Sequence, residues 1–280
     1  MCKKLTAIQK KLLVELEWFD NYCRINDLKY FIIGGTLLGA LRHGGFIPWD
    51  DDIDIGMPRC DYDRLSRLFP SNGSGNYVLE MPNSQSDDFY QPYGKLYDRT
   101  TTLIEKGRKI CVRGIYIDIF PIDGIGNTMA EAIKNYRNIK WLYYLYLSKT
   151  AVIRKDREKW KNFMAVIANM LPDFIVSETK LRSYIDRRCS RIDYNESTFC
   201  GNLLGRKFEG EIVPKDYFGD PKEIGFNGIN VFMPEKAELY LDHIYGDWKK
   251  LPPFENRVTN HDYLVCDLET PYEVYKFSIK

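Results

Sequence analysis

The chain has 280 residues, of which 44% are hydrophobic and 28% are charged. This composition is typical of a globular protein long enough to bury one large core with a sizeable insertion, and it excludes disordered and fibrous classes. The formal net charge of +1 gives no overall attraction to nucleic acid, so we expect no nucleic-acid partner.

The cysteines indicate a reducing compartment. Seven cysteines are scattered along the chain without a C-x-x-C pair, which is typical of free thiols in a cytoplasmic protein. No stretch is apolar enough to span a bilayer. We therefore expect a cytoplasmic protein, at most peripheral to the inner face of the membrane.

The first elements follow from periodicity and glycine placement. Apolar residues recur at three- and four-residue steps over residues 6–26, which predicts a helix with one apolar face. The sequence YFIIGGTLLGALRHGG then predicts a buried strand, a glycine pair and a short helix over residues 36–42, closed by Gly44 and Gly45.

A strand-rich region comes next, preceded by a helix that begins at Pro58. The first strands expected there are YVLEM (77–81), QPYGKLYD (91–98) and TTLIE (101–105). The stretch GIYIDIFPIDGIG (114–126) alternates isoleucines on one face with Tyr116, Asp118 and Phe120 on the other. We interpret it as a sheet strand with one polar, working face.

Residues 129–200 change to long helical periodicities, interrupted near Pro172, and we interpret them as a helical insertion. Between Lys134 and Lys161 there are nine Lys or Arg against only Asp156 and Glu158. The aromatic residues among them are Trp141, Tyr143, Tyr144 and Tyr146. Two interpretations stay open: a helical face that contacts anionic lipid, or a basic helix packed by its aromatic rings onto the main domain.

The last part of the chain, residues 201–280, is loop-rich. The sequence EIGFNGINVFM (223–233) predicts a hairpin, because its Asn227-Gly228 pair suits a type I′ turn. A helix from Pro234 to about Tyr245 should follow.

The segment FIPWDDDIDIGMP (46–58) concentrates acidic residues. Four aspartates fall within five positions: Asp50, Asp51, Asp52 and Asp54. A calcium loop would need glycine at its sixth position and usually glutamate at its twelfth, where this chain has Ile55 and Asp61. A solvated acidic turn is the other simple alternative.

Interleaved isoleucines favour a working site over a solvated turn. In an extended chain, Ile53 and Ile55 would be buried on one face while Asp52 and Asp54 share the other, with Cα atoms roughly 6–7 Å apart. Two such carboxylates repel unless a cation joins them, and Mg²⁺ fits because it takes a few carboxylates, water and substrate phosphate. We expect Asp50 and Asp51 to support these two aspartates and not to act as metal ligands themselves.

A third acid and a glycine pair would complete a phosphoryl-transfer site. Asp118 is the candidate acid, although a structural aspartate is its alternative explanation. Gly34 and Gly35 follow a strand and open a helix, so their N–H groups could approach an anion, although a tight packing turn would explain them too.

This order of strand, Gly-Gly, short helix, D-x-D and later aspartate resembles the nucleotidyltransferase superfamily. Four segments resemble the LicD family more narrowly, to which fukutin-related proteins are also similar. These segments are GGTLLGALRHGGFIPWDDDIDIGMPRCDYDRL, YGKLYDRTTTLIE, GIYIDIFPIDGIG and YLDHIYGDWKKLPPFENRVTNH. The resemblance runs from the first helix almost to the end and is weakest in residues 129–200.

The resemblance implies an α+β fold, a nucleotidyltransferase-like mixed sheet flanked by helices. On that basis residues 1–128 form the catalytic core, 129–200 the helical insertion, and 201–280 a segment that completes the catalytic domain.

The resemblance also implies a metal-dependent phosphotransferase. It would move phosphocholine from CDP-choline to a hydroxyl of a cell-surface or capsular glycan, for instance a teichoic acid, a lipopolysaccharide or a lipid-linked capsule precursor, and release CMP. One or two Mg²⁺ ions, or Mn²⁺, would be held by Asp52, Asp54 and Asp118, which are also the expected catalytic residues. The cysteine-based zinc site of fukutin-related protein has no counterpart, so we expect no zinc.

The expected substrate-binding residues are Gly34, Gly35, Thr36, Arg42, Trp49, Lys95, Arg257 and His261. Salt bridges would explain Arg42 and Lys95 equally well, and His261 would pass as an ordinary loop histidine. Choline prefers aromatic faces, and the rings in or beside the motifs are Trp49, Tyr93, Tyr116 and Trp248.

Two other functions use the same residues. A nucleotidyltransferase would move a nucleoside monophosphate to a sugar phosphate or small molecule and release pyrophosphate. The second is a binding protein that has lost activity. The presence of all three acids, Asp52, Asp54 and Asp118, argues against it. Whether the donor alcohol is choline, ribitol or another stays open.

Overall fold

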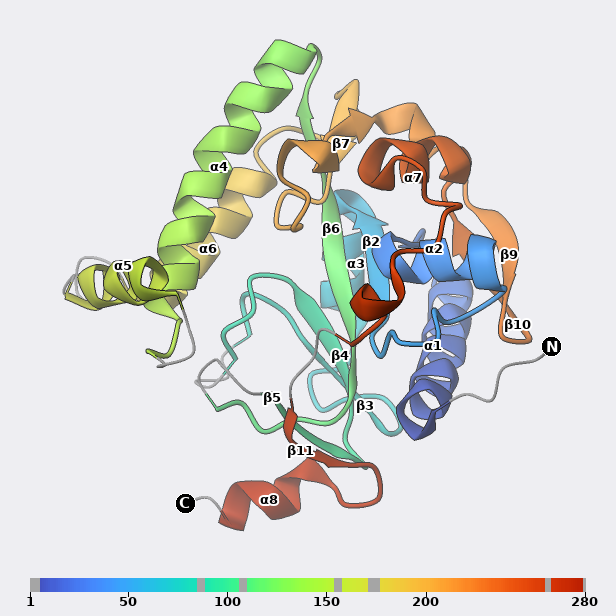
Figure 1. Ribbon diagram of the computed structural model, residues 1–280, viewed down its shortest axis with the longest axis vertical. Helices are drawn as coiled ribbons and strands as arrows, with labels where there is room; N and C mark the ends of the chain where they lie inside the picture. The colour runs from blue at the N-terminus through green and yellow to red at the C-terminus, as the bar shows by residue number, and fades with distance from the viewer. Residues whose placement is uncertain are drawn as a thin grey trace.

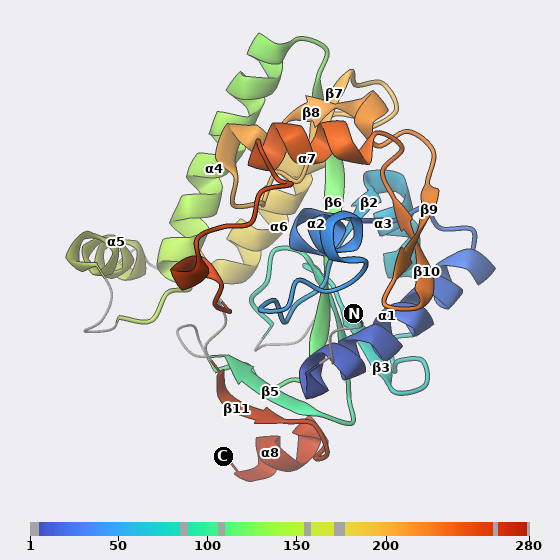
Figure 2. The ribbon, with the colours of Figure 1, turned by 45° about the vertical axis from the view of Figure 1, so that its right-hand side comes forward.

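A mixed sheet runs through the centre of the molecule, with helices on both sides (Figure 1). The computed structural model describes residues 6–84, 89–105, 110–153, 158–170, 177–259 and 263–278. Figures 1 and 2 both place α4, α5 and α6 on one side of the long strand β6, and α1, α2 and the β9–β10 hairpin on the other. The predicted α+β class with a helix-flanked mixed sheet is confirmed.

The helices are α1 (Ala7–Ile25), α2 (Gly34–His43), α3 (Arg59–Leu68), α4 (Met129–Lys149), α5 (Lys159–Met170), α6 (Glu178–Cys189), α7 (Ala237–Tyr245) and α8 (Tyr272–Ser278), with the 3-10 turns η1 (Phe208–Glu211), η2 (Lys215–Tyr217) and η3 (Phe254–Asn256). The strands are β1 (Phe31–Ile32), β2 (Asp54–Pro58), β3 (Tyr77–Glu80), β4 (Gly94–Asp98), β5 (Thr102–Glu105), β6 (Tyr116–Gly126), β7 (Phe199–Gly201), β8 (Val213–Pro214), β9 (Lys222–Phe226), β10 (Ile229–Met233) and β11 (Tyr263–Asp267).

Strand β6 organises the sheet, whose order is β1-β2-β6-β4-β3. Its first half pairs in parallel with β2 and antiparallel with β4, and its end pairs with β7, which in turn pairs with β8. Two separate ladders, β9–β10 and β5–β11, lie outside this sheet. Because β6 is buried along nearly its whole length, residues on β6 have fixed neighbours on both sides.

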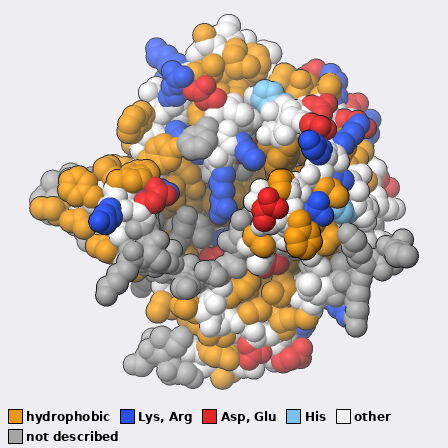
Figure 3. Space-filling model, in the orientation of Figure 1, with side chains coloured by type: hydrophobic (Ala, Val, Ile, Leu, Met, Phe, Trp, Pro, Cys, Tyr) orange, Lys and Arg blue, Asp and Glu red, His pale blue; other side chains and the backbone are white. Residues whose placement is uncertain are grey.

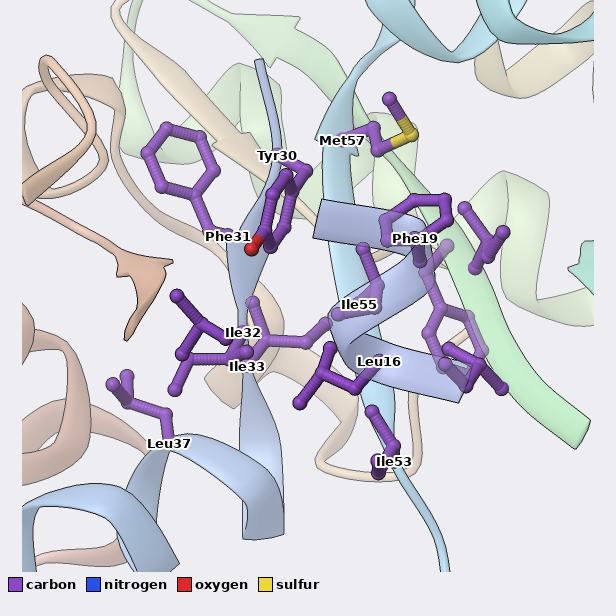
Figure 4. Packing of buried hydrophobic residues seen from close by; sticks show 14 of the residues in the cluster. Leu16, Phe19, Tyr30, Phe31, Ile32, Ile33, Leu37, Ile53, Ile55 and Met57 are labelled. Carbon is purple, nitrogen blue, oxygen red and sulfur yellow. The ribbon is translucent and has the colours of Figure 1, made fainter. Parts of the chain in front are cut away.

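Several local predictions are confirmed. Helix α1 begins with a capping box between Thr6 and Gln9, and its apolar stripe is buried. The hairpin turns at Asn227 (φ 48°) and Gly228 (φ 99°), the positive φ values that a type I′ turn requires. Figure 4 shows Ile53 and Ile55 among the buried side chains of the main core, and both are fully buried.

Three boundaries differ from the expected ones. Helix α2 begins at Gly34, so the glycine pair forms its first turn. Helix α7 begins at Ala237, three residues later than predicted, because Lys236 has non-helical dihedral angles (φ −107°, ψ 52°) as its N-cap residue. Strand β2 begins at Asp54. The predicted break near Pro172 lies outside the described residues.

A buried ion-pair network joins the helical segment to the sheet. Arg59 of α3 contacts both carboxyl oxygens of Asp123 on β6, at 2.6 and 2.9 Å, and reaches Asp186 on α6 at 2.9 Å. Buried partners in bidentate geometry depend strongly on one another, because an unpaired buried charge is costly. The network therefore fixes α6 against the core. The division at residues 129 and 200 stays a prediction.

Glu15 of α1 gives a testable pH dependence. It is fully buried, and burial followed by repulsion from Asp98 raises its pKa well above the ordinary 4.5. Neither carboxyl oxygen has a hydrogen-bond partner among the described residues. Since the folded state holds this proton more tightly than the unfolded state, stability falls as the pH rises above about 4.5.

We expect Glu15→Met to raise the free energy of unfolding by roughly 1–3 kcal/mol at about pH 8, and by clearly less at about pH 5. Urea unfolding at the two pH values measures the difference. Glu17→Met, on the exposed side of the same helix, is the control and should show no such pH-dependent gain. An equal gain at both pH values would contradict the assignment.

Candidate active site

The parallel pairing of β2 with β6 brings Asp54 beside Asp118. The two residues are register partners, and the N–H of Asp118 donates to the carbonyl oxygen of Ile53 at 3.0 Å. Paired strands lie about 4.8 Å apart and partner side chains share a face, so the two carboxylates are neighbours on one side of the sheet. The predicted convergence of these two acids is found in the structure.

A third charged residue continues the row. Lys95 of β4 is the register partner of Asp118 on its other side, and its Nζ lies 2.8 Å from Asp118 Oδ1. The Lys95 ammonium also lies 3.1 Å from the ring centroid of Tyr116. Asp54, Asp118 and Lys95 therefore follow one another across three adjacent strands.

The surroundings oppose ionisation of both acids. Burial raises the pKa of Asp118 to about 6, although contact with Lys95 pulls it down. Burial, together with the nearby Asp52, Asp118 and Asp50, raises the pKa of Asp54 well above its ordinary value. Asp52 lies just before strand β2 and acts on Asp54 through its charge. The site thus holds more negative charge than it can easily stabilise by itself.

These residues lie in a cleft of about 440 Å³. Its described acidic lining residues are Asp50, Asp52, Asp54, Glu105, Asp118 and Glu211. Its described basic lining residues are Lys95, Arg206 and Lys207. The aromatic ones are Trp49, Tyr93, Tyr116, Phe120, Tyr143, Tyr240 and Tyr245. A cleft with six acids against three bases repels a polyphosphate unless a cation is bound there.

The carboxylates of Asp54 and Asp50 lie against the first turn of α2. Gly34 has φ +55°, and a Cβ added there would lie 3.0 Å from Asp54 Oδ2; one added at Gly35 would lie 2.8 Å from Asp50 Oδ2. Thr36 Oγ1 accepts a hydrogen bond from the N–H of Asp54 at 2.9 Å. The glycines therefore leave room for acids beside the positive end of a helix, which favours negative charge. Direct phosphate binding by Gly34 and Gly35 stays a prediction.

Other predicted residues lie farther from the acids. Arg42 is not among the described lining residues, and its guanidinium donates to the carbonyl oxygens of Trp248 and Lys250 at 2.8 and 3.3 Å. Trp248 is buried in the core. Arg257 lies 5.6 Å from the ring of Trp49, a lining residue.

His261 falls outside the described residues. Asp51, the remaining aspartate of the acidic segment, accepts hydrogen bonds from Thr259 at 2.7 Å and Tyr263 at 3.0 Å. It therefore fastens the C-terminal segment beside the cleft, consistent with the supporting role expected for it.

Sequence comparisons identify the family. A family model described as the LicD/FKTN/FKRP nucleotidyltransferase domain matches residues 27–148. The lipopolysaccharide cholinephosphotransferase LicD of Haemophilus influenzae is 30% identical over 271 residues, covering 92% of this chain and 97% of that protein. The chain belongs to the LicD family. It is a transferase.

Other relatives match only short segments of the chain. Human ribitol 5-phosphate transferase FKRP is 57% identical over 41 residues, which is 15% of this chain and 8% of that protein. Mannosyltransferase regulator 4 of Saccharomyces cerevisiae is 31% identical over 84 residues, 27% of this chain and 7% of that protein. The chain thus spans only a small part of these two relatives.

Four charged residues that line the cleft were not predicted from the sequence. Arg206, Lys207 and Glu211 come from the segment after β7, and Glu105 from the end of β5. The run Gly-Arg-Lys at 205–207 was a usable signal, since glycine followed by two bases suits an anion-binding loop.

The donor set fits Mg²⁺ or Mn²⁺. Carboxylate oxygens are the hard ligands these ions prefer, and Mg²⁺ commonly takes one or two carboxylates and completes its coordination with water and substrate phosphates. In the part of the chain that the structure describes, no three acidic, histidine or cysteine side chains are grouped as a finished metal site. Asp54 and Asp118 offer two neighbouring carboxylates to such an ion, and a metal held by Asp52, Asp54 and Asp118 stays a prediction.

Gly34→Ala tests the contact between the helix and Asp54. Gly34 and Gly44 begin and end α2, and both have positive φ, but only at Gly34 does an added Cβ meet another atom within 4 Å. We expect each alanine substitution to lower stability by about 1–2 kcal/mol. Only Gly34→Ala should also lower transferase turnover, because it displaces the Asp54 carboxylate.

Thermal or urea unfolding and initial rates of both variants provide the measurement. Equal turnover in Gly34→Ala and Gly44→Ala would show that the Asp54 contact is unimportant.

Proposed function

We propose that this enzyme transfers phosphocholine from CDP-choline to a hydroxyl of a cell-surface or capsular glycan, and that it releases CMP. The observation that carries the proposal is the row Asp54, Asp118 and Lys95 at the floor of an acid-rich cleft. The relative that aligns with 92% of the chain supports it, because that protein is named a lipopolysaccharide cholinephosphotransferase. Teichoic acid and capsule precursors are acceptors of the same chemical class.

Asp54 and Asp118 would hold Mg²⁺ or Mn²⁺, with Asp52 beside them. A bound divalent ion would offset the negative charge of the diphosphate and of the departing CMP. The excess of acids over bases among the described residues of the cleft supports a cation here.

The chain's own residues perform the remaining steps. Asp118 accepts the proton of the acceptor hydroxyl while Lys95 holds its Oδ1 atom. The hydroxyl oxygen forms a bond to the phosphorus of phosphocholine, and the bond from that phosphorus to the CMP oxygen breaks with its electron pair. Arg206 and Lys207 face the same cleft and would balance charge on the nucleotide phosphate.

The structure narrows the aromatic residues available for choline. Trp248 is buried, and the face of Tyr116 is already covered by Lys95. Trp49 and Tyr93 line the cleft and are the rings we assign to the trimethylammonium group, which binds aromatic faces. The acidic residues nearby also favour a quaternary cation.

We place the reaction in the cytoplasm because the cysteines are scattered and lack the pairing pattern of an exported disulfide protein. None of the described helices is long and apolar enough to cross a bilayer.

Donor identity is tested by thermal shift and by product analysis of the full chain with Mg²⁺. CDP-choline should raise the unfolding temperature more than CTP, UTP or ATP, since a ligand that binds only the folded state stabilises it by mass action. CDP-ribitol tests the donor alcohol, and incubation with a glycan acceptor should release CMP. Preferential stabilisation by a nucleoside triphosphate, with pyrophosphate as product, would instead support nucleotidyl transfer.

Asp54→Asn should lower turnover by about a thousandfold or more while leaving the unfolding temperature unchanged or higher, because it removes a carboxylate that neighbouring acids destabilise. Asp51→Asn is the matched control. Asp51 belongs to the same acidic segment but binds Thr259 and Tyr263, so turnover should stay within a few-fold while stability falls. If Asp54→Asn keeps full activity, the assignment of the site is wrong.

A further inference from the structure

Helix α5 exposes a broad apolar surface. Of its twelve residues only Ala165 and Ala168 are buried. Its exposed large apolar side chains are Trp160 (62% exposed), Phe163 (63%), Met164 (44%), Val166 (42%), Ile167 (42%) and Met170 (76%). At about 100° per residue these six positions span an arc of about 160°, opposite the two alanines.

This surface projects from the body of the protein. Figures 1 and 2 place α5 on the outer side of α4, away from the sheet, and Figure 3 shows hydrophobic side chains gathered over it. Val152 and Ile153, between α4 and α5, are also exposed. Exposed apolar clusters of this kind mark protein or membrane contacts.

The two interpretations of the basic stretch are now separable. Tyr143 and Tyr146 of α4 are buried in a hydrophobic cluster, so this part of the helix packs onto the protein. Trp141 and Tyr144 of α4 are exposed as well, but the larger set of outward-facing apolar side chains belongs to α5. Packing onto the protein thus explains the buried rings of α4, and lipid contact, the other interpretation left open, fits α5 better.

Charge favours an anionic bilayer as the occupant. Helix α5 has Lys159 and Lys161 on either side of Trp160 and contains no acidic residue. Glu158, just before the helix, pairs with Lys161, and no ion pair to Lys159 is found among the described residues. Lysine next to tryptophan and phenylalanine is typical of helices that lie in the membrane interface, whereas the cores of protein interfaces are depleted of lysine.

We propose that α5, with Val152 and Ile153, docks the enzyme onto an anionic membrane surface, its apolar arc entering the head-group region and Lys159 contacting lipid phosphates. Docking itself is independent of the chemistry in the cleft. The benefit of docking does rest on the proposed function, because a membrane-bound enzyme would be held close to a lipid-linked glycan acceptor.

Vesicle flotation of the full chain tests docking without donor or acceptor. The vesicles are phosphatidylcholine alone and phosphatidylcholine mixed with phosphatidylglycerol. The wild-type chain should float with the mixed vesicles, and more weakly with phosphatidylcholine alone. Lys159→Gln should weaken binding to the mixed vesicles about fivefold.

The decisive variant combines Phe163→Gln and Ile167→Gln, one turn apart on the apolar arc. It should bind mixed vesicles at least about tenfold more weakly than the wild type. The matched control combines Val14→Gln (57% exposed) and Ile25→Gln (83%), two exposed apolar residues of α1 far from α5, and it should bind like the wild type. Unchanged circular dichroism and unfolding temperature would show that each variant is folded.

Docking would be overturned by a wild-type chain that does not float or by an α5 variant that floats like the wild type. It would also be overturned if the wild type were a dimer and the α5 variant a monomer, and neither bound vesicles. The last result would show that a second copy covers α5. Turnover with CDP-choline and a water-soluble glycan fragment should be equal in the wild type and the α5 variant. If that turnover is absent in both while flotation behaves as expected, the proposed function fails and docking stands.

Discussion

The parallel pairing of β2 with β6 is the constraint on which the site depends. It sets two carboxylates side by side. Burial raises the pKa of both, repulsion from Asp52 and Asp118 adds to the shift of Asp54, and repulsion from Glu105 and Asp52 adds to that of Asp118. The surrounding structure offsets this cost. Buried isoleucines hold β2 in place, Lys95 pairs with Asp118, and the first turn of α2 presents its positive end to Asp54. A cation and a diphosphate would complete a charge balance that the protein leaves unfinished.

The helical segment borders the cleft through Tyr143 of α4 and supports the loop after β7. Arg59 fixes α6 through Asp186, and Lys140 of α4 donates to the carbonyl oxygen of Gly205 at 2.5 Å. That contact holds the loop that carries Arg206, so a segment remote in sequence from the acids contributes a basic residue to their cleft. The helices therefore have different roles, since α4 supports a loop of the cleft, α6 is fixed to the core, and α5 presents its apolar surface outward.

Local sequence patterns predicted much of the fold. The three- and four-residue spacing of α1, the Asn-Gly turn of the hairpin, and the alternation of isoleucine with acid on β2 and β6 each encode which way side chains point. These patterns also predicted that Asp52, Asp54 and Asp118 converge, since a polar residue between buried isoleucines must face the opposite side of a strand. The sheet register sets Asp54 beside Asp118. The family motifs added the fold class and the class of enzyme.

The sequence by itself therefore determined the elements, their faces and the acids that meet. Tertiary structure decided which distant segments reach those acids: Arg42 turned to the carbonyl oxygens of Trp248 and Lys250, the face of Tyr116 was covered by Lys95, and Arg206 entered the cleft. It also decided that α5, and not the buried rings of α4, carries the exposed apolar surface. The physical reason is that spacing along a chain fixes the direction of a side chain within its own element, whereas its partner is chosen by long-range packing of other elements.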